Sequence, residues 1–317
     1  MAVTLEQAKL NVQDDLQLGV IDEFRKSTWL FDNLIFDDVV SATGGGATLT
    51  YAYTRLKTQP TAGFRNVNEE YATSEVEKQR FTADLKIFGG GFKVDRVIAN
   101  MGGIADEVAL QMAQKIKAAG ALFNDTVING DSAVDSKSFD GLEKALKGSS
   151  TEYKPADAID LSTSEAVTKN FQAFLDALDE FLMTLDGKPS FIGGNTKLIA
   201  KLRACARRAG MYQVTKDSFG NQVESYGGIP FVDFGSKPGT NDDVVKTETT
   251  GETSLYAARI GLDGFHGISM AGQPPVKTWL PDFATAGAVK EGEVEMIAAV
   301  ALKATKAAGV MRKIKVK

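Results

Sequence analysis

The segment Ala47-Thr-Leu-Thr-Tyr-Ala-Tyr-Thr-Arg-Leu-Lys57 sets the architecture expected of this chain. Its apolar and polar side chains alternate, which is typical of a β-strand with one packed face. A polar, acidic segment follows, and Arg80-Phe-Thr-Ala-Asp-Leu-Lys-Ile-Phe88 then repeats the strand pattern. Two strands around a long polar excursion predict an exposed hairpin, here called the ribbon, which suits contact with other molecules better than catalysis.

A long helix is predicted directly after the ribbon, over residues 102–123. Ile104, Val108, Met112 and Ile116 recur every four residues, which places them on one face of a helix. At 1.5 Å per residue this helix would be roughly 30 Å long. Its apolar face predicts that it packs against the core.

The remaining patterns alternate between helix and strand. Residues 3–27 read as one or two short helices, a helix begins near a cap at Ser164 and runs to about residue 182, and Asn195 caps another helix. Strand patterns occupy residues 188–194, 226–232, 254–260, 294–302 and 307–316. Together with the ribbon these elements predict the α+β class.

The composition of the chain excludes several classes of protein. The 317 residues are 43% hydrophobic and 24% charged, which is ordinary for a soluble globular protein. The net charge of -5 lacks the basic excess of a sequence-specific DNA-binding protein. The start of the chain has no signal-peptide pattern, and no apolar run reaches the ~20 residues that span a bilayer, so no membrane association is predicted.

Residues for catalysis or for a cofactor are scarce. His266 is the only histidine and Cys205 the only cysteine, so no zinc site of the usual kind and no disulfide can be built, and no Gly-x-Ser-x-Gly motif accompanies the histidine. We therefore expect no catalytic residue, no cofactor and no metal, and interpret Cys205 as inert.

Two glycine runs punctuate the ends of the ribbon, and neither is followed by the Lys-Ser/Thr of a phosphate-binding loop. Glycine permits sharp bends and close backbone approach, so both runs are interpreted as hinges or bulges. The candidate hinge residues are Gly44, Gly45, Gly46, Gly89, Gly90 and Gly91.

The order of these segments resembles the major capsid protein of tailed double-stranded DNA bacteriophages, with the Hong Kong 97-like fold. The matching pieces are the arm at 1–45, the ribbon, the helix at 102–123, Ile128-Asn-Gly-Asp131 with Phe139-Asp-Gly-Leu142, Gly187-Lys-Pro-Ser-Phe-Ile192 and Gly227-Gly-Ile-Pro-Phe-Val232. Each motif is common by itself, and their order along almost the whole chain carries the resemblance.

The resemblance implies a division of the chain. The expected parts are an N-terminal arm at 1–45, an extended β-hairpin loop at 46–90, a peripheral domain with a spine helix at 91–150, an axial domain at 151–270 and C-terminal strands at 271–317 that complete both domains.

The resemblance also implies a function and partners. The chain would self-assemble as hexamers and pentamers into the icosahedral head shell of the virion, built in the host bacterial cytoplasm. Its expected partners are itself, a portal complex, a decoration protein and packaged double-stranded DNA held without sequence recognition. Only about 45 residues precede the ribbon, so a fused scaffold is not expected, and the resemblance implies either a separate scaffolding protein or none at all. Some members of the family join their subunits through a Lys-Asn isopeptide bond. Lys57 and Lys78 lie in the ribbon, but no Asn or Glu partner can be assigned to them, so no crosslink is predicted.

Nine residues are candidates for contacts between subunits. Phe64, Val67 and Tyr71 would be apolar anchors of the ribbon, and its acidic residues would seek basic partners on a neighbour. The apolar end of the arm would lie either on its own chain or on a neighbour. The full set is Trp29, Phe31, Phe64, Val67, Glu69, Glu70, Tyr71, Arg207 and Arg208.

Three other functions remain open at this point. A bacterial encapsulin nanocompartment shares the fold that the resemblance implies and would contain a folded enzyme in place of DNA. A fibre, decoration or other structural virion protein is a second alternative. An α/β enzyme with an unrecognised site is the third, and it would form a small oligomer with a deep polar pocket.

Overall fold

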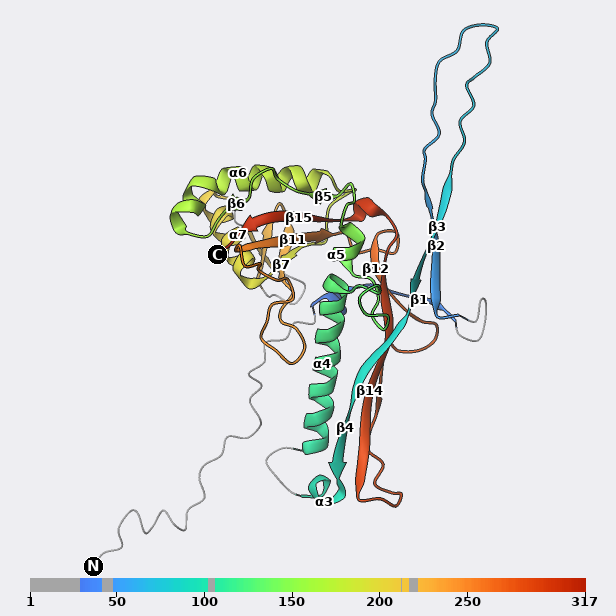
Figure 1. Ribbon diagram of the computed structural model, residues 1–317, viewed down its shortest axis with the longest axis vertical. Helices are drawn as coiled ribbons and strands as arrows, with labels where there is room; N and C mark the ends of the chain where they lie inside the picture. Colours follow the sequence, from blue (N-terminus) through green and yellow to red (C-terminus); the bar gives the residue numbers. More distant parts are fainter. Residues whose placement is uncertain (1–28, 42–47, 102–105, 212, 217–221) are drawn as a thin grey trace, which may run out of the picture.

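The computed structural model describes residues 29–41, 48–101, 106–211, 213–216 and 222–317, which form a two-part body from which a ribbon projects (Figure 1). The helices expected within 3–27 and the glycine run at 44–46 lie outside the described residues. The α+β class is confirmed, because helices and strands interleave along the whole described chain. Among the described helices, none is long and apolar enough to cross a membrane.

A five-stranded sheet forms the elongated part of the body, and its strands follow the order β1-β12-β14-β13, with β4 also paired to β14. These strands are β1 (Phe36–Val40), β4 (Lys86–Asp95), β12 (Phe265–Met270), β13 (Val276–Trp279) and β14 (Val289–Leu302). The antiparallel pairing of β4 with β14 runs without interruption from Lys86 opposite Ala298 to Asp95 opposite Val289. Residues 86–88 therefore belong to this sheet, and the ribbon ends earlier than the predicted Phe88.

The long helix α4 (Glu107–Asn129) runs beside β4 and β14 (Figure 1). The carboxylate of Asp106 caps its first turn by accepting hydrogen bonds from the backbone N–H groups of Val108 and Ala109, at 2.9 and 3.3 Å. The helix continues to Asn129, beyond the predicted end at residue 123. Val127 and Ile128 extend its buried stripe, and this packing explains the longer helix.

An eight-stranded sheet forms the second part of the body, in the order β5-β15-β11-β7-β10-β9-β8, with β6 paired to β15. Its strands are β5 (Glu152–Tyr153), β6 (Ile159–Asp160), β7 (Phe191–Gly194), β8 (Gln213–Lys216), β9 (Gln222–Tyr226), β10 (Ile229–Asp233), β11 (Glu252–Ala258) and β15 (Ala308–Lys315). The predicted strands at 188–194, 226–232, 254–260, 294–302 and 307–316 all have counterparts in the two sheets.

Two helices cover one face of the eight-stranded sheet, α6 (Ser164–Met183) and α7 (Thr196–Arg208) (Figure 1). Asn195 caps α7 as predicted, since its side chain accepts a hydrogen bond from Leu198 N at 2.9 Å. The cap of α6 is Thr163, one residue before the predicted Ser164, and its hydroxyl accepts from Ala166 N at 3.1 Å.

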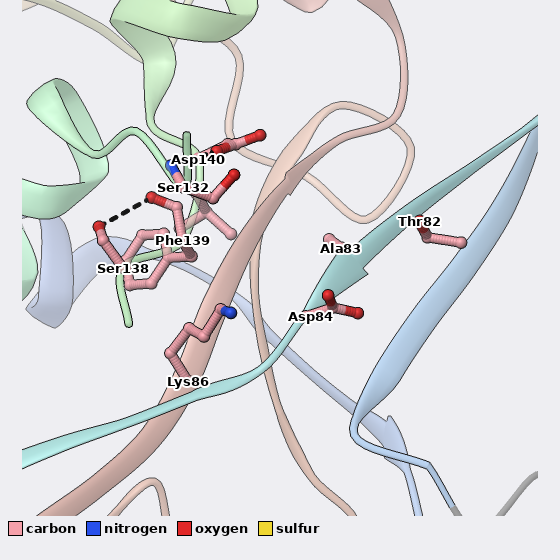
Figure 2. A pocket seen from close by; sticks show the side chains of 9 residues that line it. Thr82, Ala83, Asp84, Lys86, Ser132, Ser138, Phe139 and Asp140 are labelled. Carbon is pink, nitrogen blue, oxygen red and sulfur yellow. Dashed lines mark hydrogen bonds between the residues drawn. The ribbon is translucent and has the colours of Figure 1, made fainter. Parts of the chain in front are cut away.

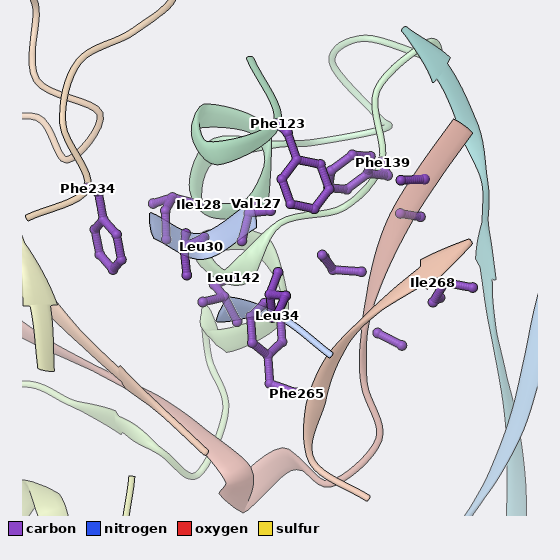
Figure 3. Close-up of a cluster of buried hydrophobic side chains, with 14 of the residues drawn as sticks. Leu30, Leu34, Phe123, Val127, Ile128, Phe139, Leu142, Phe234, Phe265 and Ile268 are labelled. Carbon is purple, nitrogen blue, oxygen red and sulfur yellow. The ribbon is translucent and has the colours of Figure 1, made fainter. Parts of the chain in front are cut away.

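Two hydrophobic clusters meet at β11, because alternate side chains of a strand point to opposite faces. Leu255 and Ala257 face the cluster under α6 and α7, while Tyr256 and Ala258 face the other. Figure 3 shows the second cluster, in which Phe123 of α4 and Phe139 lie beside the short helix α5 (Leu142–Leu146). Three further short helices are α2 (Trp29–Asn33), α3 (Arg96–Ala99) and η1 (Thr305–Ala307).

Candidate intersubunit surface

The ribbon consists of β2 (Thr50–Leu56) and β3 (Lys78–Asp84), and it projects from the body (Figure 1). The two strands pair antiparallel, from Thr50 opposite Asp84 to Leu56 opposite Lys78. Every residue from 56 to 80 is exposed. Hydrogen bonds continue past the strands, from Lys57 N to Glu77 O at 2.8 Å and from Thr61 N to Ser74 Oγ at 2.8 Å, and they hold the two sides of the loop together.

Three apolar side chains at the ribbon tip are largely uncovered by the described part of their own chain. Phe64 is 109% exposed, Val67 86% and Tyr71 62%. The Arg65 guanidinium lies 5.1 Å from the centre of the Tyr71 ring, so this part of the tip has some local order. Such a cluster on a projecting loop is typical of a surface that another molecule covers.

The acidic residues of the tip are arranged differently from the expectation. The Glu69 carboxylate accepts hydrogen bonds from Asn66 N at 3.1 Å and from Asn66 Nδ2 at 3.0 Å, so its contact lies within the tip. Arg207 and Arg208 lie exposed in the last turn of α7, and Arg208 donates to Ser164 Oγ at 3.1 Å. Contacts of Glu69, Glu70, Arg207 and Arg208 with a neighbouring subunit stay a prediction.

The base of the ribbon is fastened to the body by side chains that the sequence reasoning did not single out. Tyr53 Oη donates to Leu302 O at 3.0 Å, and Arg55 Nε donates to Lys303 O at 2.7 Å. Arg55 also donates to the Leu302 carbonyl and to Thr305 Oγ1, and its guanidinium lies 4.2 Å from the centre of the Phe81 ring. Tyr51, Tyr53 and Arg55 are every second residue of β2, so they lie on one face of the strand. This spacing is the sequence signal from which the contact between ribbon base and body could have been predicted.

A cavity of about 260 Å³ lies at the seam between the ribbon base and the body (Figure 2). Lys86 lines it, but its ammonium already donates to Ser136 O at 2.9 Å. Asp140 is engaged as well, with Lys144 at 2.8 Å and Ser132 N at 2.8 Å. Both charged groups are therefore already engaged by neighbouring groups of the chain, which suits a structural joint better than a reaction site.

Close packing explains the glycines of the Asn-Gly-Asp and Gly-Leu motifs, which lie in the turn after α4. Gly141 N donates to Gly130 O at 2.8 Å, which closes the turn after α4. A Cβ at Gly130 would lie 2.2 Å from Phe139 O, and a Cβ at Gly141 would lie 2.5 Å from Thr126 O. Only glycine allows backbones to approach this closely. The adjoining carboxylates of Asp131 and Asp140 both contact Lys144.

The two aromatic residues at the end of the arm pack on their own chain. The Trp29 ring lies 5.2 Å from that of Phe191, and the Phe31 ring lies 5.6 Å from that of Phe123. Both are partly buried against the core. The end of the arm thus lies on its own chain, which is one of the two surfaces expected for it, and contact of the partly exposed Trp29 and Phe31 with a neighbouring subunit stays a prediction.

The glycines predicted as a second hinge lie inside a strand. Gly89, Gly90 and Gly91 belong to β4 and are paired with Glu295, Val294 and Glu293 of β14. A Cβ at Gly89 would lie 1.9 Å from Val294 O, so close approach of the two strands explains this glycine. A hinge movement here stays a prediction, and the chain leaves the ribbon several residues earlier, at Leu85.

The two residues considered for chemistry are both buried. Burial raises the pKa of the Cys205 thiol to about 11, against the opposing charges of Arg208 and Lys201, so the thiolate is disfavoured. His266 is fully buried beneath the ribbon base. Within the described part of the chain, no three His, Cys, Asp or Glu side chains are grouped so that they could hold a metal ion.

Comparisons with known proteins give a clear result only for structure. No family model matches the chain, and no curated protein matches it by sequence. Solved structures match over the full length. An encapsulin complex from Synechococcus elongatus PCC 7942 is 17% identical, with a TM-score of 0.66 over 100% of this chain and 98% of that chain.

Two capsid structures match as completely. The capsid of Myoviridae phage XM1 is 9% identical, with a TM-score of 0.62 over 99% of both chains. The capsid of a native GTA particle is 15% identical, with a TM-score of 0.58 over 99% of both chains. At these identities the likeness establishes the fold alone: the chain has the fold of the phage capsid proteins, which the encapsulin shares.

Proposed function

We propose that this chain is the subunit of a closed protein shell of the phage-head type, which assembles from hexamers and pentamers. The observation that carries the proposal is the full-length structural likeness to capsids, ribbon and body included. Lattices of identical copies need a surface by which each copy reaches the next, and the ribbon is such a surface.

The ribbon supports this function through its reach and its exposed tip. At ~3.3 Å per residue, a side of about fifteen residues extends roughly 50 Å. An arm of this length laid on a neighbour would bury an area comparable to the ~1,600 Å² of a standard interface. Phe64 and Val67 would then lose the exposure that they have in the single chain, which gives the contact its apolar centre.

The remaining partners follow from the same proposal. The shell would belong to a virion, assemble in the bacterial cytoplasm with a separate scaffolding protein and a portal complex, and accept a decoration protein outside. Its interior would hold double-stranded DNA without base recognition. The net charge of -5 suits this, because a weakly repulsive wall lets the nucleic acid slide during packing. The chain would act as a structural protein and not as an enzyme.

A second candidate function is an encapsulin-type compartment. It is favoured by the encapsulin structure, whose TM-score of 0.66 exceeds those of the two capsids compared above. The two functions differ in what the shell contains. Nucleic acid within particles purified from a producing cell supports the phage-head function, and a folded enzyme supports the encapsulin function.

The first experiment is electron microscopy of the chain expressed alone. Closed shells, tubes, or rings of five or six copies would support a self-assembling shell protein. If the chain remains a monomer or dimer when it is co-expressed with a scaffolding protein encoded beside it, the proposal is wrong.

A shortened ribbon tests the part of the proposal that concerns its reach. Residues 59–75 are replaced by Asn-Gly, because residues 58 and 76 continue the register of β2 and β3 and a two-residue turn can close them. The fold of the body should remain, since every residue removed is exposed. We expect this variant to lose the ability to form closed shells. A Gly-Ser replacement of the same length as the native segment is the control, and it should also form no closed shells if the side-chain contacts of the ribbon, and not its length alone, are required. Normal shells from the Asn-Gly variant would overturn the role given to the ribbon.

A further inference from the structure

Four side chains form a ribbon-base cluster where the ribbon meets the body: Asp37 of β1, Tyr51 of β2, His266 of β12 and Lys303, the residue directly after β14. Tyr51 Oη donates to Asp37 Oδ2 at 2.9 Å, and Lys303 Nζ lies 3.7 Å from the same oxygen. The His266 ring meets the Tyr51 ring nearly edge-on, with centres 5.9 Å apart. Contacts of this cluster thus join three strands of the body to the first strand of the ribbon.

His266 is unusual within this cluster. Its side chain is fully buried, and neither ring nitrogen has a hydrogen-bond partner among the described residues. A buried polar group without a partner costs free energy, and a charged one costs far more. The neutral imidazole is therefore tolerated here, while the imidazolium would need water or a new partner.

We infer that His266 is a pH-sensitive latch, which holds the ribbon base against the body while it is neutral and releases it on protonation. This inference concerns the single chain, and it does not depend on shell assembly.

The charges around His266 act in opposite directions. Burial lowers the pKa of His266 below its ordinary 6.5, and the nearby Lys303 ammonium lowers it further. The charges of Asp37 and Asp263 raise it, but the net direction is down. Because the closed state has the lower pKa, it binds fewer protons than an opened state in which water reaches the ring. Closure is thus fully favoured above about pH 6.5 and weakens as the pH falls below that value.

The ribbon is the element most easily displaced by a charged His266. β12, which carries His266, is paired on one side with β1 and on the other with β14. In contrast, β2 and β3 pair only with each other among the described strands. Movement of Tyr51 away from the ring breaks no backbone pairing between sheets. Protonation should therefore lift the ribbon base and leave the five-stranded sheet intact.

Hydrogen exchange on the full-length chain, followed by mass spectrometry, tests this inference. Exchange of peptides covering residues 50–56 and 80–85 is measured at pH 7.5 and 5.5 and corrected for the intrinsic effect of pH. At pH 5.5, one unit below the ordinary pKa, exchange at the ribbon base should rise, by at most about tenfold. Peptides of β11 and β15 serve as internal controls and should not change. No rise at the ribbon base would overturn the inference.

A variant with a side chain that cannot titrate separates a latch from a merely structural histidine. His266→Gln should abolish the difference between pH 7.5 and 5.5, whatever its effect on exchange at pH 7.5. An equal pH-dependent rise in this variant would show that another group is responsible. All samples are compared in the same assembly state, so failure of the latch and failure of shell assembly are distinguishable.

Two further measurements keep the test decisive if His266→Gln does not fold. Lys303→Gln removes the repulsive charge, so the rise in hydrogen exchange from pH 7.5 to 5.5 should become smaller; an unchanged or larger rise contradicts the latch.

Because His266 is the only histidine, selective labelling without a histidine tag gives a single ring signal in NMR spectra. That signal should titrate below pH 6.5, and titration at or above 6.5 would also overturn the inference.

Discussion

The ribbon tip and the turn after α4 are both irregular segments that join two regular elements, yet their surroundings are opposite. Residues 56–80 are all exposed, whereas Gly130 and Gly141 are packed so tightly that one added carbon would collide with backbone oxygens. The turn contributes to the stability of the single chain. The exposed tip contributes little there, and under the proposed function its role is contact with a second molecule. Mutations of the two segments should therefore separate stability from the proposed function.

The largest loss of stability should come from the polar network between the two parts of the body. Arg312 of β15 donates to Glu152 Oε1 at 2.7 Å and to Glu143 Oε2 at 2.8 Å, and the Glu152 side chain is only 6% exposed. Arg312→Met would leave the buried Glu152 carboxylate with only the Gly148 N–H and the exposed Lys154 as partners, which costs about 3 kcal/mol. Chemical denaturation measures this loss, and Lys154→Met, which removes an exposed partner of the same Glu152, should cost less than about 1 kcal/mol. Equal losses would show that burial does not distinguish the two pairs.

A pair of identical substitutions compares the two segments directly. Gly130→Ala would place a Cβ 2.2 Å from Phe139 O, while Gly63→Ala at the ribbon tip would meet no atom within 4 Å. The first should lower the free energy of unfolding by about 3 kcal/mol, and the second should change it by less than about 0.5 kcal/mol. The difference between the two thermal midpoints checks this expectation, and similar midpoints would remove the basis of the comparison.

Acid should affect the body and the ribbon base in different ranges of pH. Burial alone would raise the pKa of Glu152, but the Gly148 N–H, Lys154 and Arg312 together lower it to about 2. Because the folded pKa lies below the ordinary 4.5, its contribution is complete above pH 4.5 and is lost as the pH falls from 4.5 toward 2. In this range the free energy of unfolding of Glu152→Gln should decrease by about 2 kcal/mol less than that of the native chain. Urea denaturation at several pH values measures it, and an unchanged slope between pH 4.5 and 3 would contradict the assignment.

Much of the fold could be predicted because its elements follow local rules. The stripe that includes Val108 and Met112 predicts the long helix, Asn195 marks the start of α7, and alternation around Tyr51 predicts the ribbon. Each of these signals depends on residues that are close in the sequence. The order of the elements was then enough to indicate the class of fold that the structural comparisons confirm.

What could not be predicted depends on contacts between distant segments. Local pattern cannot show that Trp29 meets Phe191, or that the strand after Leu85 changes partner from β2 to β14. The predicted end of α4 at residue 123 is too early, because burial of Val127 and Ile128 against distant segments continues the helix to Asn129. The fastening of Arg55 to Leu302 and Lys303 spans almost 250 positions and leaves no local signature.

A mutation at the ribbon base should lower the free energy of unfolding by less than one in the body and by more than one at the tip. Arg55→Ala removes the hydrogen bonds to the Leu302 and Lys303 carbonyls and the contact with Phe81. Water can replace part of these bonds at the seam, so the expected loss is about 1 kcal/mol, with faster exchange confined to the ribbon. Arg65→Ala is the matched control, since Arg65 contacts Asn66, Glu69 and Tyr71, which all belong to the tip. Faster exchange throughout the body of Arg55→Ala would mean that this residue supports the core as well.

The smallest effect on stability should come from the residues with the largest proposed effect on assembly. Phe64→Ser with Val67→Ser exchanges two highly exposed apolar groups for polar ones, so the free energy of unfolding should change by less than about 0.5 kcal/mol. If the tip is the centre of an intersubunit contact, the same double variant should lose most of its shells, because the hydrophobic centre of an interface supplies most of its binding energy. Val134→Ser is the control, since Val134 is 86% exposed but lies in the turn after α4. Chemical denaturation and particle yield are measured on the same samples. Unchanged stability with an unchanged yield of shells would mean that the tip has no role in assembly. Reduced stability would mean that the tip packs on its own chain.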